Sequence, residues 1–139
     1  MKPQESRIGN LVCYNGKVVK VEQITKRKIG YHTKPNETRM NYARLCEVEP
    51  IPITEELLLK IGFKKKRDGY LHYSDHNDEF SIKFDLGYAF IEYANLCFNP
   101  EDVTETNYGS SLEFPNTLHL HTLQNIWHLL TGKKLEIKL

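Results

Sequence analysis

The residues best suited to chemistry are basic and aromatic side chains in the first third of the sequence. Lysine and arginine bind phosphate, and exposed aromatic rings stack on nucleic-acid bases. This composition is typical of a surface that binds nucleic acid or another anionic ligand. The candidate residues are Lys20, Lys26, Arg27, Lys28, Tyr31, Arg39, Tyr42 and Arg44.

The distribution of charge favours the same interpretation but leaves alternatives open. The net charge is only +1, yet residues 1–46 carry ten Lys/Arg against three acids, and residues 47–139 carry nine against fifteen. Such an asymmetry indicates an anionic partner for the basic part. It also fits a basic face that is merely solvated, or one attracted to the acidic remainder within one chain or between chains. The sequence therefore leaves open whether the protein forms a homo-oligomer.

Two groups of histidines have the ligand types that a metal ion requires. In the first group, the Ser, Asp and Asn content of the segment predicts a solvated turn between two strands, and no HExxH motif accompanies it. In the second group, two histidines are seven residues apart, whereas a zinc pair on one helix is normally three or four apart. We therefore expect no metal site and no cofactor. The groups are His72, Asp75, His76, Asp78 and Glu79, and His119, His121 and His128.

No motif for nucleophilic or nucleotide-dependent catalysis is present. The segment 108–111 (YGSS) lacks the GxSxG pattern, and the sequence has neither a P-loop nor a GxGxxG motif. Cys13, Cys46 and Cys97 are far apart and form no CxxC pair, which argues against a disulfide framework or a thiolate zinc site. The sequence predicts no catalytic residue, and we expect a protein that is not an enzyme.

The elements that carry the basic residues are predicted to be short strands. Residues 8–14 and 17–24 favour strands, and Asn15-Gly16 between them is typical of a type I′ hairpin turn. Val19 and Val21 are expected to face one side of the second strand, and Val18, Lys20 and Glu22 the other. Residues 27–31 and 39–48 are the third and fourth strands. The pattern of residues 1–49 therefore predicts that this part of the chain forms a basic, SH3-like β module.

Residues 50–139 predict an α+β subdomain packed with the module as one unit. Thr54 is a suitable N-cap for a short helix over 54–61, apolar nearly all round, which ends before Gly62. Strands over 63–67, 70–73, 79–84 and 88–98 form an antiparallel meander, followed by an acidic loop over 101–111. A closing helix covers about 120–131, with Trp127 on its apolar face, and a last strand covers 135–139.

Three segments together resemble a family of small uncharacterised proteins found in phages and mobile elements of Bacteroides-like bacteria. The resemblance implies an accessory protein acting in the cytoplasm of a bacterial host cell. It carries over no catalytic residue, because its motifs are a hairpin, a capped helix and a closing helix. The segments are RIGNLVCYNGKVVKVEQI, EPIPITEELLLKIGF and HTLQNIWHLLTGKKLEI.

The sequence thus predicts an α+β protein, with an N-terminal SH3-like β module followed by an antiparallel sheet and two helices. The favoured function is a non-enzymatic accessory binding protein that engages a host or phage macromolecule, protein or nucleic acid, through the basic module. The alternative is a small-ligand binder that sequesters a phosphorylated nucleotide, and a metal-dependent hydrolase ranks lowest. No apolar run approaches 18 residues and no signal peptide is evident, so we expect a cytoplasmic protein without membrane contact.

Overall fold

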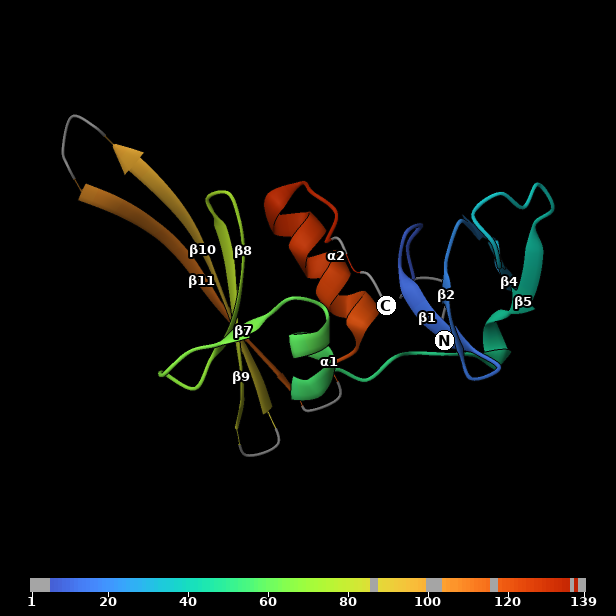
Figure 1. Cartoon of the computed structure of the whole chain (residues 1–139), viewed down its shortest axis with the longest axis horizontal. Helices are drawn as coiled ribbons and strands as arrows, with labels where there is room; N and C mark the ends of the chain where they lie inside the picture. The colour runs from blue at the N-terminus through green and yellow to red at the C-terminus, as the bar shows by residue number, and fades with distance from the viewer. Residues whose placement is uncertain (1–5, 86–87, 100–103, 116–117, 136, 138–139) are drawn as a thin grey trace. The chain divides into compact units, whose positions relative to one another are not determined.

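The chain divides into two compact units, both built mainly from antiparallel strands. The computed structural model describes residues 6–85, 88–99, 104–115, 118–135 and 137 (Figure 1). The first unit comprises the chain up to Pro52 together with residues 119–137, and the second comprises residues 53–118. Three antiparallel sheets and two α-helices in the described residues confirm the α+β class.

The first unit contains two three-stranded sheets, β2-β1-β6 and β3-β4-β5. The two residues between β1 and β2, Asn15 and Gly16, have φ values of 50° and 72°. Positive φ at both positions is the requirement of a type I′ turn, so the predicted hairpin is confirmed. The strands are β1 (Leu11–Tyr14), β2 (Lys17–Lys20), β3 (Gln23–Ile24), β4 (Lys28–Tyr31), β5 (Asn41–Arg44) and β6 (Val48–Glu49).

The long fourth strand predicted over 39–48 is interrupted. After β5 the chain forms a 3-10 helix, η2 (Leu45–Glu47), and then β6, which pairs with β1. The cause is the burial of Leu45, whose N–H donates to the carbonyl of Arg27 while its side chain enters the core. The chain therefore turns at Leu45 and leaves one sheet for the other.

Alternation along the strands separates a core face from a solvent face. Val19 and Val21 are buried, whereas Val18 is 48% exposed and Lys20 is exposed, so the two sides of the strand are separated as the sequence predicts. The same alternation buries Ile29 on β4. The core of the two sheets consists of Val12, Val19, Val21, Ile29, Tyr31, Ala43, Leu45 and Val48.

The predicted closing helix is α2 (Leu120–Thr131), and it belongs to the first unit. It ends at Gly132, whose left-handed backbone (φ 72°) lets its N–H donate to the carbonyl of His128. The sequence predicts a boundary between two parts of the chain at residue 49, and that boundary places this helix in the second part, residues 50–139. Two hydrogen bonds explain the difference: Gln124 Oε1 accepts the Leu11 N–H, and Asn125 Oδ1 accepts from Asn10 Nδ2. Their partners are 113 and 115 residues apart in the sequence, so no local pattern predicts them. Of the predicted last strand, Leu135 and Ile137 are not in a strand, and Glu136, Lys138 and Leu139 lie outside the described residues.

The second unit is a five-stranded sheet in the order β11-β10-β9-β8-β7, with the short helix α1 (Glu55–Lys60). The Thr54 hydroxyl accepts the Leu57 N–H at 3.1 Å, which confirms the predicted cap. Leu58 is fully buried but Leu59 is 47% exposed, so α1 is covered on one face and not nearly all round. The strands are β7 (Lys64–Lys65), β8 (Leu71–Asp75), β9 (Asp78–Asp85), β10 (Tyr88–Asn99) and β11 (Thr104–Pro115).

The acidic loop predicted over 101–111 is mostly strand. β11 pairs with β10 along its whole length, and the two form the longest hairpin of the described chain (Figure 1). Pairing with the otherwise open edge of β10 satisfies backbone groups whatever the side-chain composition, so tertiary context overrides the polar sequence. Residues 100–103 lie outside the described residues. No helix in the described ranges has the length and apolar character needed to cross a membrane.

Candidate nucleic-acid interface

The outer face of the sheet β3-β4-β5 gathers most of the predicted basic residues. The register pairs Lys28 with Arg44 and Gly30 with Tyr42. Because Ile29 and its neighbours alternate into the core, Lys28, Tyr42 and Arg44 share the opposite, exposed face. The sheet therefore presents two cations and one aromatic ring on adjacent strands.

The turn between β3 and β4 adds two further cations at one end of this face. Thr25 closes the turn, because its N–H donates to the Lys28 carbonyl at 2.9 Å and its hydroxyl accepts the Lys28 N–H at 3.2 Å. Lys26 and Arg27 occupy the tip and are exposed. The turn connects directly to Lys28, which pairs with Arg44, so all four basic residues lie at the same end of the sheet.

The four basic side chains of this region are exposed. Among the residues that the structure describes, none of Lys26, Arg27, Lys28 and Arg44 forms an ion pair with a carboxylate. Like charges on one exposed face repel one another and favour an anionic partner. We refer to Lys26, Arg27, Lys28, Tyr42 and Arg44 as the basic face.

Tyr42 is the aromatic residue of the basic face. Its ring is 48% exposed, and its hydroxyl donates to Gln23 Oε1 at 3.2 Å. The Lys28 ammonium lies 4.0 Å from the ring centroid. An exposed cation–π contact of this kind contributes only about 0.5–1 kcal/mol. A base can therefore displace Lys28 from the ring at low cost, while the lysine moves to a phosphate.

Arg39 lies in the loop before β5 and is exposed. Glu37 holds this loop, since its Oε2 accepts from the Thr33 hydroxyl at 2.7 Å, the Thr33 N–H at 2.9 Å and Asn41 Nδ2 at 3.2 Å. These hydrogen bonds, that of the Thr33 hydroxyl above all, lower the pKa of Glu37. The Glu37 carboxylate therefore stabilises the loop, and in the described structure it forms no ion pair with Arg39.

Two of the predicted residues lie elsewhere. Tyr31 is only 9% exposed and its ring lies 5.9 Å from that of Tyr14, so it belongs to the core and is not available to stack on a base. Burial also raises the pKa of Tyr31. Lys20 ends β2 in the other sheet, opposite Leu11. The alternation of β4 could have identified Tyr31 as inward-facing, because it is two residues from buried Ile29.

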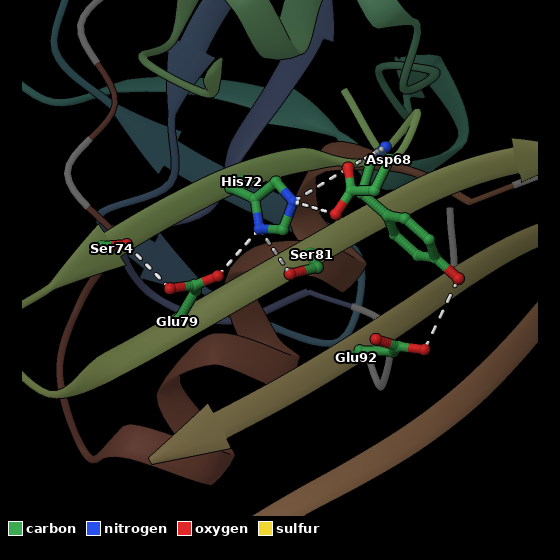
Figure 2. Close-up of polar contacts among 7 residues, drawn as sticks. Asp68, His72, Ser74, Glu79, Ser81 and Glu92 are labelled. Atoms are coloured by element: carbon green, nitrogen blue, oxygen red, sulfur yellow. Dashed lines mark hydrogen bonds and ion pairs between the residues drawn. The ribbon is translucent and has the colours of Figure 1, made fainter. Parts of the chain in front are cut away.

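A separate polar cluster surrounds His72 in the second unit. Figure 2 shows the imidazole between two carboxylates, with Nε2 at 3.0 Å from Asp68 Oδ2 and Nδ1 at 2.8 Å from Glu79 Oε1. Ser81 Oγ also lies 2.8 Å from Nδ1. The His72 side chain is 11% exposed and Ser81 is 8% exposed. A Ser, His and Asp in contact invite comparison with a catalytic triad.

The contacts of this cluster are all made within the protein. Both ring nitrogens of His72 lie within hydrogen-bond distance of a carboxylate, and Nδ1 is also within reach of Ser81 Oγ. The nearly buried serine is also inaccessible to a substrate. The cluster therefore joins β8 to β9 and to the turn at Asp68, which is a structural role.

The pKa of Asp68 predicts a pH dependence of stability. The hydrogen bond from the Tyr70 N–H is the main cause that lowers this pKa, and His72 adds to it. A carboxyl whose pKa is lowered by folding stabilises the protein above its unfolded pKa of about 3.9, and this contribution is lost as pH falls through the folded value. We expect Asp68→Asn to be less stable than the wild type above about pH 5, with the two converging below about pH 4.

Urea unfolding of both proteins between pH 3 and pH 7 measures this effect. Asparagine retains the oxygen that accepts from Tyr70, so the comparison isolates the charge of Asp68. Asp68→Ala serves as the control, because it removes the acceptor as well and should be less stable than the wild type at every pH. A constant difference between Asp68→Asn and the wild type across this range would contradict the assignment.

The other histidines do not converge. His76 has φ 54° in the turn between β8 and β9, which confirms the predicted turn. His121 is buried and stacks on His119 at 5.7 Å, whereas His128 is exposed near the end of α2. Within the ranges that the structure describes, no three His, Cys, Asp or Glu side chains are grouped as metal ligands. Cys46 is exposed and Cys13 is half-buried.

Comparisons with protein-family models, with curated proteins and with solved structures gave no match for this chain. The functional argument therefore depends on the geometry and charge of the sites themselves.

Proposed function

We propose that the protein is a non-enzymatic binding protein that engages single-stranded nucleic acid through its basic face. The observation that carries this proposal is that four exposed cations and one exposed tyrosine lie on one sheet face and its adjoining turn, and that none of the four cations pairs with an acid among the described residues. Phosphate contacts supply most of the affinity of such a surface, and stacking on an aromatic ring adds about 1–3 kcal/mol per base.

The geometry gives each residue a role in this proposal. Lys26 and Arg27 at the turn tip, with Arg44 beside them, contact consecutive phosphates. Lys28 leaves the Tyr42 ring to join them, and one base takes its place. An open sheet face admits a single strand whose bases are unstacked, whereas duplex DNA offers its bases only within the grooves. Because the contacts are to phosphates and to the face of a base, binding is tolerant of sequence.

In this proposal residues 1–49 act as an SH3-like β module. The return of β6 to pair with β1, directly after a 3-10 helix, supports this description. The family resemblance adds a setting: a phage or mobile-element accessory protein in the cytoplasm of a bacterial host.

Fluorescence anisotropy with labelled 12-nucleotide single-stranded DNA and RNA tests the proposal. The wild type should bind both, with affinity falling as salt rises from 50 to 300 mM, by a slope of about −0.7 per phosphate contact. The variant Lys26→Ala/Arg27→Ala/Lys28→Ala/Arg44→Ala should lose at least about tenfold in affinity and show a shallower salt slope. Tyr42→Ala should weaken binding with an unchanged slope, because it removes stacking and no charge.

A charge-matched variant in the second unit provides the control. Lys60, Lys64, Lys66 and Arg67 are also exposed, so replacing these four by alanine removes the same charge from a different surface. This control should bind nearly as tightly as the wild type. Absence of wild-type binding at 50 mM salt, or equal losses in the two quadruple variants, would overturn the proposal.

A further inference from the structure

A cavity of about 210 Å³ lies within the first unit, apart from the basic face. It is lined by the segment before β1, the end of β2, the second half of α2 and the segment that follows α2. All of these belong to the same compact unit. The size is below the range of about 300–1,000 Å³ usual for ligand sites, so the cavity suits a small molecule.

Amide side chains fix the walls of this cavity. Gln124 Oε1 accepts the Leu11 N–H at 2.9 Å, and Gln124 Nε2 donates to the Gly9 carbonyl at 3.4 Å. Asn10 Oδ1 accepts the Arg7 N–H at 2.7 Å, and Asn10 Nδ2 donates to Asn125 at 2.9 Å. Asn10 and Gln124 are buried, and their hydrogen bonds hold the segment before β1 to α2. The cavity is therefore preformed.

The charged side chains among the described lining residues are positive. Arg7, Lys20 and Lys134 line the cavity, together with His128, and no acid is found among the lining residues that the structure describes. In the described part of the chain, none of the three cations forms an ion pair. Cations that converge on one cavity without acids repel one another and raise the local concentration of anions. Arg7 adds a planar guanidinium, which suits the paired oxygens of a phosphate.

The lining also includes large hydrophobic side chains, one of which is mostly exposed. Ile8 is 65% exposed at the cavity although it is a large hydrophobic residue, and Leu11, Leu135 and Ile137 lie beside it. A ligand with an apolar body would remove this surface from water, at about 25 cal/mol per Å² buried. The side-chain amides of Asn10 and Gln124 are already engaged by the protein, so charge and apolar contact are the main sources of recognition.

We propose that this cavity binds a small organic phosphate, a phosphate monoester whose body is no larger than about one ring. Arg7, Lys20 and Lys134 bind the phosphate oxygens, and Ile8 and Leu135 cover the apolar body. His128 is held by its Nδ1–H, which donates to the Lys133 carbonyl at 3.3 Å. Its Nε2 then keeps a second hydrogen-bonding role toward a ligand.

This site is distinct from the basic face. Lys20, which the sequence groups with the basic residues, is a residue of the cavity. Its partners Arg7 and Lys134 come from the two ends of the chain and are brought together by the packing of α2. The two proposals can therefore be tested independently. Variants of the cavity should retain nucleic-acid binding, and variants of the basic face should retain phosphate binding.

Isothermal titration calorimetry with phenyl phosphate, inorganic phosphate and benzyl alcohol tests this inference on the full chain. We expect phenyl phosphate to bind at one site, about tenfold more tightly than inorganic phosphate, because only the former has an apolar body. Benzyl alcohol, which lacks the charge, should give no measurable binding. Arg7→Ala/Lys20→Ala should weaken phenyl phosphate at least about tenfold, and Lys134→Gln should also weaken it.

Lys17→Ala is the matched control, because Lys17 lies on the same strand as Lys20 but outside the cavity lining. It should bind phenyl phosphate as the wild type does. Fluorescence of Trp127 establishes that each variant is folded. The inference is overturned if phenyl phosphate does not bind, if it binds no more tightly than inorganic phosphate, or if Lys17→Ala and the double variant lose affinity equally.

Discussion

Replacement of Ile29 by alanine is expected to lower the free energy of unfolding of the first unit by about 2–5 kcal/mol. Ile29 is fully buried at the centre of β4, and truncation leaves a cavity that the short flanking strands cannot close by moving. The same strand carries Lys28 on its opposite face, so loss of this packing should also weaken nucleic-acid binding. The effect is large relative to the stability of a small unit, about 5–15 kcal/mol.

Urea unfolding followed by Trp127 fluorescence measures this loss. The protein has a single tryptophan, which lies in α2 of the first unit, so the signal reports on that unit. Ile29→Val should cost only about 0.5–1.5 kcal/mol, and Val18→Ala, at a position 48% exposed, should cost less still. An Ile29→Ala variant as stable as Val18→Ala would show that β4 is not packed as described.

Replacement of Gln124 by alanine is expected to cost about 2–4 kcal/mol and to open the cavity. The substitution removes two hydrogen bonds and leaves the Leu11 N–H without its acceptor in a buried setting. The segment before β1 should then detach from α2. Phenyl phosphate affinity should fall with it, although Gln124 carries no charge.

Hydrogen exchange distinguishes a local loss of contacts around Leu11 from a general loss of stability. Amide hydrogen exchange at Leu11 should accelerate in Gln124→Ala under native conditions, while exchange in β4 and β5 stays slow. Thr122→Ala on the same helix serves as the control and should leave exchange at Leu11 unchanged. Protection at Leu11 equal to that of the wild type would refute the role of Gln124.

Local patterns in the sequence determined most of the elements. Asn15-Gly16 tolerates positive φ and so specifies a hairpin, Thr54 supplies a hydroxyl to an open helix terminus, and Gly132 ends α2 in the left-handed conformation. Period-2 alternation also separated Val19 and Val21 from Val18, and the structure shows that the side with Val19 and Val21 faces the core. These signals depend on residues close together in the chain, and each can therefore be identified from the sequence alone.

Long-range contacts decided the rest. Thr104–Pro115 is polar and acidic, and it is a strand only because β10 offers it an edge along which to pair. The 3-10 helix at Leu45 arises because one buried side chain must reach the core of two sheets at once. Neither the pairing partner of a segment nor the geometry of a core is encoded within a few residues.

The candidate sites show the same division. Composition was sufficient to indicate a basic surface. In the structure Lys28 and Arg44 lie on the paired strands β4 and β5, and Lys26 and Arg27 lie in the turn before β4. The alternation along residues 28–31 could have placed Tyr31 in the core, whereas only the tertiary structure shows that Lys20 lines the cavity with Arg7 and Lys134. Helix packing and hydrogen bonds between backbone and side-chain amides bring together side chains from the two ends of the chain. The spacing of these residues in the sequence does not predict that contact.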